Sequence, residues 1–285
     1  MREVRQAAVA GTFYPADPEE LRQQIDRLLE EARGSADGAP PDSAGSPHYD
    51  TGGPRALIAP HAGYLYSGPT AARAFDTLAR VAGSIRRVVV IGPSHFVPFA
   101  GVALPEATVF HTPFGDLELD AEGVGALHEL PQMVALAEPH RREHAVEVEL
   151  PFLQTVLGDF NIVPLVTGEA TAEQVAEVLE MVWDDETLVV VSSDLSHFHH
   201  YDAACRLDAA TAQTIVAGEP HELGEGSACG RLAIQGLKIA ARRRGMDISL
   251  LDLRNSGDTA GPRDEVVGYG AFRVDAVADA QQAAK

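Results

Sequence analysis

Short, unbroken runs of valine, isoleucine and leucine constrain this fold most, because a strand without polar alternation must be covered on both faces. Four such runs occur, at residues 55–60, 86–94, 161–168 and 187–193. Helical patterns follow at 67–82, 171–183, 201–218 and 229–245, and further strands are predicted at 247–257 and 265–274. Strands that alternate with helices indicate an α/β fold, here a three-layer α/β/α domain with a mostly parallel central sheet.

The chain of 285 residues shows no internal repeat, and we expect one domain over residues 1–285. A helix is predicted to begin at Pro18, where Asp17 can cap its first turn. Residues 34–53 are rich in glycine, proline, serine and aspartate, which predicts a mobile loop, and residues 276–285 are expected to form a tail.

Charge and cysteine content indicate which binding partners and which cellular location to expect. The chain has 42 acidic and 22 basic residues and a formal net charge of −20. Such a surface repels phosphate backbones and anionic lipid, so we expect neither a nucleic-acid nor a membrane partner. Two cysteines, no signal-like N-terminus and no run of transmembrane length together favour a cytoplasmic protein.

Titratable side chains follow three of the predicted strands at the point where each strand ends. His61 follows 55–60, His95 follows 86–94, and Asp194 and His197 follow 187–193. Parallel strands present their carboxyl ends on one edge of a sheet, where α/β proteins bind ligands. We therefore expect these side chains to converge. The alternative is that each histidine is a solvated loop residue.

A cysteine joins this group of candidates. Cys229 stands at the predicted start of the helix 229–245, after a turn rich in glycine and serine. The amino end of a helix favours thiolate, which is both a nucleophile and a metal ligand. The alternative is a small buried apolar residue, the usual environment of a lone cysteine.

Two imidazoles and a thiolate suit iron(II), copper or zinc, whereas magnesium and calcium prefer oxygen ligands. If His61, His95 and Cys229 hold the metal, His197 is free to act as general acid or base. Asp194 could orient His197 or stay ionised beside the cation. Metal-free chemistry by Cys229 and a nearby histidine is a further possibility.

The stretch HRREHAVEVELPFL, residues 140–153, fits a helix or a strand. On a helix, His144 and Glu147 share a face because they stand three residues apart. They would then form a second shell around the metal or a proton relay. A solvated acidic face is the alternative.

Several motifs resemble one known family. PHAGYLYSG, GPSH, EHAVEVELPF, SSDLSH and ACGR occur in the order found in the Memo family, whose prokaryotic members are called AmmeMemoRadiSam system protein B. The resemblance runs from about residue 4 to residue 274. It implies the fold of class III extradiol dioxygenases and a metal at His61, His95 and Cys229, with Asp194 and His197 in the same pocket. Cys229 replaces the carboxylate ligand of those dioxygenases, and at Glu149 relatives often carry a neutral group.

The resemblance also implies a function and partners. We expect a metal-dependent oxidoreductase with dioxygenase-like chemistry, using iron, or else copper or zinc, on a small-molecule or peptide substrate. A non-catalytic binding module is the alternative. Gene context in the family implies a radical SAM protein and an AMMECR1-domain protein as partners.

Overall fold

The computed structural model describes residues 3–34 and 53–277. The predicted loop 34–53 and tail 276–285 fall largely outside these residues. At their edges, Gly34 is the last residue of helix α1 (Pro18–Gly34) and Ala276 is the last residue of strand β12 (Val266–Ala276), so neither belongs to a loop or tail. The predicted cap of α1 is present, because Asp17 Oδ1 accepts hydrogen bonds from the amides of Glu19 and Glu20, each at 3.0 Å.

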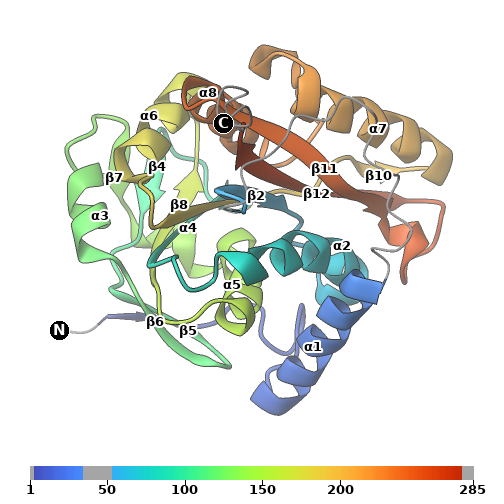
Figure 1. The fold of residues 1–285 in the computed structure, drawn as a ribbon, viewed down its shortest axis with the longest axis horizontal. Helices are drawn as coiled ribbons and strands as arrows, with labels where there is room; N and C mark the ends of the chain where they lie inside the picture. The colour runs from blue at the N-terminus through green and yellow to red at the C-terminus, as the bar shows by residue number, and fades with distance from the viewer. Residues whose placement is uncertain (1–2, 35–52, 278–285) are drawn as a thin grey trace, which may run out of the picture.

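A sheet of nine strands forms the centre of the molecule (Figure 1). In pairing order its strands are β10 (His197–His199), β12, β2 (Ala56–Ala59), β9 (Thr187–Ser192), β3 (Arg87–Pro93), β8 (Asn161–Thr167), β4 (Val102–Leu104) and β7 (Met133–Ala135), with β11 (Met246–Asn255) paired to β12. A separate small sheet contains β1 (Val4–Arg5), β5 (Val109–Thr112) and β6 (Gly115–Glu118).

The parallel centre of this sheet agrees with the prediction, and antiparallel strands flank it. Strands β2, β9, β3 and β8 are parallel neighbours, as predicted. Strand β12 runs antiparallel to β2, β10 and β11, and β4 runs antiparallel to β8. Strands β11 and β12 follow each other in the chain with ten residues between them, and so short a connection favours antiparallel pairing because parallel strands need a longer crossover.

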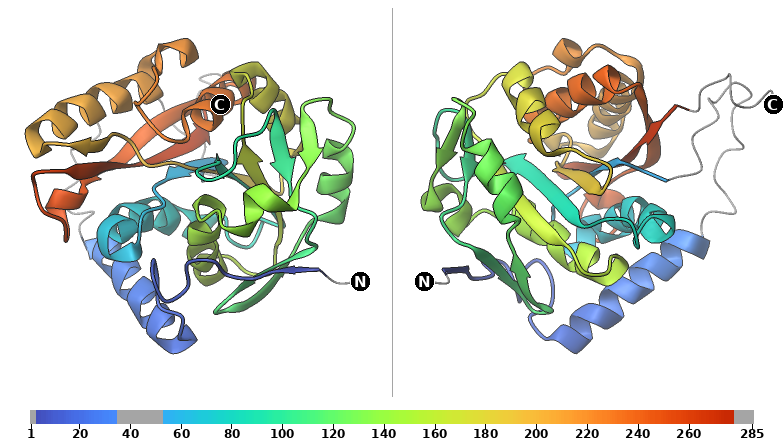
Figure 2. Two further views of the ribbon diagram at one scale, coloured as in Figure 1. Left: turned by 180° about the vertical axis from the view of Figure 1, so that it is seen from behind. Right: turned by 60° about the vertical axis from the view of Figure 1, so that its left-hand side comes forward.

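Helices cover both faces of this sheet, as the unbroken apolar runs predict. Alternate residues of one strand face opposite cores: Val88 and Val90 belong to one apolar cluster, and Val89 and Ile91 to the other. The first cluster includes residues of α1, α2 (Tyr64–Asp76) and α5 (Ala145–Val156), and the second includes residues of α6 (Ala172–Val182), α7 (Tyr201–Ala217) and α8 (Arg231–Arg243). Figures 1 and 2 show these two helical layers with the sheet between them. The predicted three-layer α/β/α architecture is therefore confirmed.

Helix α2 and residues 96–142 differ from the predictions. Helix α2 begins at Tyr64, three residues earlier than predicted, and a 3-10 turn, η2 (Thr77–Arg80), follows it. Residues 96–142 carried no predicted element, yet they contain β4 to β7, α3 (Ala121–Leu127) and α4 (Ala137–Arg141). Their strands are three or four residues long, too short to show a clear period.

The ambiguous stretch around residue 145 is helical, because α5 spans Ala145–Val156 and accommodates Pro151 within it. The other short elements are the 3-10 turns η3 (Pro220–Glu222) and η4 (Ser256–Asp258). No helix within residues 3–34 and 53–277 is long and apolar enough to cross a membrane.

Candidate metal centre

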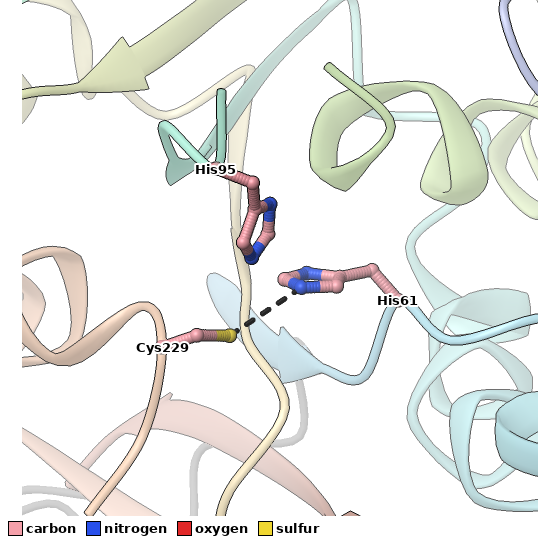
Figure 3. Close-up of side chains that lie close together, drawn as sticks. All are labelled: His61, His95 and Cys229. Atoms are coloured by element: carbon pink, nitrogen blue, oxygen red, sulfur yellow. Dashed lines mark hydrogen bonds between the residues drawn. The ribbon is translucent and has the colours of Figure 1, made fainter. Parts of the chain in front are cut away.

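Three side chains from distant segments meet at the carboxyl edge of the parallel strands (Figure 3). His61 lies two residues beyond β2, and His95 lies two residues beyond β3. Cys229 immediately precedes Gly230, the residue that caps α8. One ligand atom from each of the three residues lies within 4.8 Å of the others. The predicted convergence of these three residues is therefore present.

The spacing of two of the donor atoms fits a single cation. His61 Nε2 and Cys229 Sγ are 3.4 Å apart. A cation bound to nitrogen at about 2.1 Å and to sulfur at about 2.3 Å, with a tetrahedral angle between them, would hold the two atoms about 3.6 Å apart. The pair is therefore close to ligating geometry without large movement of either side chain.

Glu143 orients His95. The Nδ1 atom of the His95 ring lies 2.8 Å from Glu143 Oε1, and the His95 amide donates to Glu143 Oε2 at 2.7 Å. Burial works against ionisation of Glu143, but the His95 ring and the surrounding amides outweigh it and lower its pKa to about 2. The ionised carboxylate holds the proton on Nδ1 of His95, which leaves Nε2 for a ligand. The His95 side chain is 27% exposed, so the site opens to solvent on its side.

His61 is almost fully buried. Burial, with a smaller contribution from the charge of His95, lowers the pKa of His61 to about 3, so its ring is neutral at physiological pH. Its Nδ1 lies 2.7 Å from the hydroxyl of Ser192, the last residue of β9. Nε2 is then the atom that faces Cys229.

Cys229 does not behave as a helix-activated thiol. Burial, together with the negative charge of Asp194, raises the pKa of Cys229 to about 12. This direction is opposite to the one expected from a helix terminus. The thiol lies outside the first turn, since Gly230 is the cap of α8. A metal would have to displace the thiol proton, as it does at other thiolate sites.

Asp194 forms hydrogen bonds with two of the candidate ligands. Its carboxylate accepts the His61 amide at 2.8 Å, its own amide donates to Cys229 Sγ at 3.2 Å, and the Cys229 amide donates to its carbonyl at 3.2 Å. The hydrogen bond of its carboxylate is thus to the backbone of His61 and not to the ring of His197. Burial raises the pKa of Asp194.

His197 acts on the candidate metal centre through its charge and is not one of the three side chains that meet there. It is the first residue of β10, it pairs with Val267, and it is half-buried. A positive charge on His197 lowers the pKa of His61, which places the two rings in the same electrostatic environment. Its neighbour Phe198 has φ of 58°, a strained value for a residue with a side chain, and the backbone there turns Phe198 outward to 71% exposure.

His144 supplies another imidazole to the site. Its ring stacks on His95 with centroids 4.8 Å apart and meets His61 edge-on at 5.4 Å. Burial, and then the charge of His61, lowers the pKa of His144 to about 4. Ligand atoms of His95, Glu143 and His144 also lie within 4.8 Å of one another. The predicted proximity of His144 to the metal site is therefore present.

Glu147, in contrast, does not contact His144. Its buried carboxylate contacts the guanidinium of Arg5, the amides of Ala8 and Val9 at 2.7 and 3.0 Å, and the hydroxyl of Tyr14 at 2.5 Å. All of these belong to the N-terminal segment, which passes beside α5 (Figure 2). His144 is the residue before α5 and not part of it, so the expected shared helix face is absent. Glu147 anchors the N-terminus.

Glu143 is the site residue that the sequence interpretation missed. It directly precedes His144, and its Oε1 accepts the amides of His144 and Ala145 at 2.9 and 3.0 Å. An acidic residue just before a helix is an expected partner for the free amides of the first turn, and that signal was present. Its contact with His95, 48 residues away, could not be read from local pattern.

A cavity of about 250 Å³ adjoins Cys229. It lies at the ends of β3 and β8, and its lining includes Ser94, Phe99, Thr167, Cys229 and Arg231. Its lining contains neither His61 nor His95, so the cavity reaches the candidate metal centre on the side of Cys229.

Comparison with known proteins identifies the family of this chain. A family model described as "Memo-like protein" matches residues 5–273. MEMO1 family proteins of Methanopyrus kandleri and Aeropyrum pernix are each 35% identical, covering 94% and 95% of this chain and 98% and 99% of the relative. One from Saccharolobus solfataricus is 34% identical over 94% of this chain and 98% of its own length.

A crystal structure of an uncharacterized protein from Escherichia coli K12 aligns with 76% of this chain and 98% of its own, at 12% identity and a TM-score of 0.47. The family match and the three relatives cover the strand ends and the helix start that carry His61, His95, Asp194 and Cys229. The chain belongs to the Memo family.

Proposed function

We propose that this protein is a metal-dependent oxidoreductase with dioxygenase-like chemistry, and that His61, His95 and Cys229 bind its metal. The observation that carries the proposal is the meeting of two imidazoles and one sulfur, from three distant segments, within 4.8 Å. This donor set suits iron(II), with copper and zinc as alternatives. Three protein ligands leave further positions for water, O2 or substrate.

The surrounding residues support this assignment through hydrogen bonds. Ligating histidines normally donate their second ring N–H to a neighbouring acceptor, which fixes the ring and the tautomer. His95 has Glu143 in that position, and His61 has Ser192. The bound metal would supply Lewis-acid and one-electron chemistry.

The protons of such a reaction need a separate group. We assign that task to His197, which is half-buried and whose positive charge lowers the pKa of His61. His144 is a second candidate for proton transfer, since its ring contacts both His61 and His95. Asp194 holds the backbone positions of His61 and Cys229, and its carboxylate adds negative charge near the cation when ionised.

The test is metal analysis of protein purified without oxygen, followed by measurement of O2 uptake. We expect about one iron per chain, strongly reduced in His61→Ala and in Cys229→Ser. Cys205→Ser is the matched control, because Cys205 is an exposed free cysteine on α7. If His61→Ala and Cys229→Ser keep the metal content of the unaltered protein, the ligand assignment is wrong.

A second candidate function is a non-catalytic module that docks an AMMECR1-domain or radical SAM partner. Among the described residues, the exposed aromatic side chains are Tyr66, Phe96 and Phe198, and each lies within five positions after a site histidine. Exposed apolar side chains that gather in one region favour a contact surface. This function predicts partner binding that Cys229→Ser preserves and that Phe96→Ser with Phe198→Ser weakens, measured by titration calorimetry with each purified partner.

A further inference from the structure

The hydroxyl of Ser192 has more polar neighbours than its single hydrogen can serve. Its Oγ lies 2.6 Å from the carbonyl oxygen of Ala145, 2.8 Å from Glu149 Oε1 and 2.7 Å from His61 Nδ1. A serine hydroxyl offers one hydrogen and two lone pairs. Three neighbours at these distances therefore require one donation and two acceptances.

The carbonyl of Ala145 decides how these hydrogens are distributed. A carbonyl oxygen can only accept, so the Ser192 hydrogen must point at it. The two lone pairs of Ser192 then face His61 and Glu149, and both of these groups must donate. His61 has to carry its proton on Nδ1, and Glu149 has to carry one on Oε1. A carboxylate at Glu149 would compete for the same serine hydrogen and leave two oxygens 2.6 Å apart with no hydrogen between them.

The surroundings of Glu149 point to the same protonation state. Its side chain is completely buried, and within residues 3–34 and 53–277 its Oε2 has no hydrogen-bond partner. Leaving an ionised carboxylate unpaired in the interior is costly, and such groups become neutral instead. Burial raises the pKa of Glu149 well above its ordinary value, and the charge of Asp194 acts in the same direction.

We propose that Glu149 is a protonated carboxylic acid that fixes the Ser192 hydroxyl and thereby holds His61 in the tautomer with a free Nε2. Glu149 and Ser192 are positioning residues for His61. The consequence for metal binding rests on the proposed function, but the protonation of Glu149 and the tautomer of His61 do not.

The two candidate histidine ligands are then supported in different ways. Glu143 is an ionised carboxylate in direct contact with His95. Glu149 is a neutral acid that acts on His61 through a serine. A neutral acid orients a ring without adding negative charge. Of these two carboxyl groups, Glu143 beside His95 is therefore the one that brings negative charge to a ligating histidine.

Two measurements on metal-free protein test the proposal. The infrared difference spectrum between the unaltered protein and Glu149→Gln at pH 7 should contain the carbonyl band of a protonated carboxylic acid. Nitrogen-15 NMR of the histidine rings, with the His61 signals assigned through His61→Gln, should show the Nδ1–H tautomer. Glu149→Gln should keep that tautomer, because its amide can also donate to Ser192. Ser192→Ala should give a mixture of tautomers.

A third measurement uses iron(II) and compares the same substitution at two carboxyl groups. Glu149→Gln should leave iron affinity within about twofold, because it replaces one neutral donor by another. Glu143→Gln and Ser192→Ala should each weaken it about 10- to 100-fold, the usual effect of removing a ligand's hydrogen-bond partner. Equal losses in Glu149→Gln and Glu143→Gln would show that Glu149 is ionised.

The outcomes separate the two proposals. An absent acid band, or a His61 ring protonated on Nε2, overturns the assignment of Glu149 whatever the metal data show. A protein that has the band and the tautomer but binds no iron leaves this inference standing and removes the proposed function.

Discussion

Glu143 contacts both the ring and the backbone of His95, with 2.8 Å between Oε1 and Nδ1 and 2.7 Å between Oε2 and the amide nitrogen. One carboxylate thus sets the position and the tautomer of a candidate ligand. The same carboxylate accepts the amides that begin α5. The Glu143 carboxylate therefore joins the start of this helix to the candidate metal centre through hydrogen bonds.

This connection predicts that Glu143→Gln weakens metal binding more than it weakens the fold. The amide can keep one hydrogen bond to His95 but loses the negative charge, so we expect about 10- to 100-fold lower iron affinity in competition with a chelator. Glu138→Gln is the control, because Glu138 is exposed and forms an ion pair with Arg141 on the same helix. Unchanged affinity in Glu143→Gln would contradict this role.

The N-terminal segment should depend on the buried pair of Arg5 and Glu147. Arg5→Met leaves the Glu147 carboxylate buried without its cation, which costs about 3–5 kcal/mol. Arg27→Met removes an exposed guanidinium whose hydrogen bond is to its own helix, and should cost little. Urea unfolding followed by circular dichroism compares the two variants, and equal midpoints would argue against the pair as an anchor.

Acid should destabilise the protein partly through His140. Burial lowers the pKa of His140 to about 4, and its Nε2 lies 3.1 Å from the carbonyl of Ala103. The unfolded chain, with an ordinary pKa of 6.5, binds the proton more readily than the folded one. The contribution of neutral His140 to the free energy of unfolding is therefore complete above pH 6.5. It is lost as the pH falls towards 4, and the loss is about 3 kcal/mol at most.

The check is the difference in unfolding free energy between pH 7 and pH 4. His140→Gln should shrink that difference, since glutamine does not titrate in this range. The exposed His128→Gln should leave it unchanged. A difference that is the same in His140→Gln and in the unaltered protein would exclude His140 as a source of acid sensitivity.

Close packing between β3 and α5 gives a further prediction. A Cβ at Gly92 would lie 2.7 Å from the Cβ of Ala145, whereas one at Gly83 would meet no atom of the described residues within 4 Å. Gly92→Ala should push the start of α5 away from the sheet and destabilise the protein by about 1–3 kcal/mol. Iron affinity should fall as well, because Glu143 moves with that helix. Gly83→Ala should change neither property.

The strands and most helices followed from local pattern. Apolar runs without alternation predicted the four central strands, and their shared direction predicted that His61 and His95 would meet. The short strands of residues 96–142 did not follow, because a strand of three or four residues carries no usable period. Strands β11 and β12 were predicted, but their antiparallel direction was not.

The sequence did not predict which polar groups the buried side chains contact. Glu147 has the spacing expected of a partner for His144, yet it pairs with Arg5, 142 residues away. Glu143 and Glu149 look alike in the motif EHAVEVELPF, but their surroundings lower the pKa of Glu143 and raise the pKa of Glu149.

The sequence by itself therefore determined the layers, the strand ends and the candidate ligands, because these depend on hydrophobic periodicity and on chain direction. Only the tertiary structure decided the hydrogen-bond partners of those ligands and the protonation of the carboxyl groups around them. Both depend on burial and on contacts such as His61 with Ser192, which join residues 131 positions apart and which no local pattern encodes.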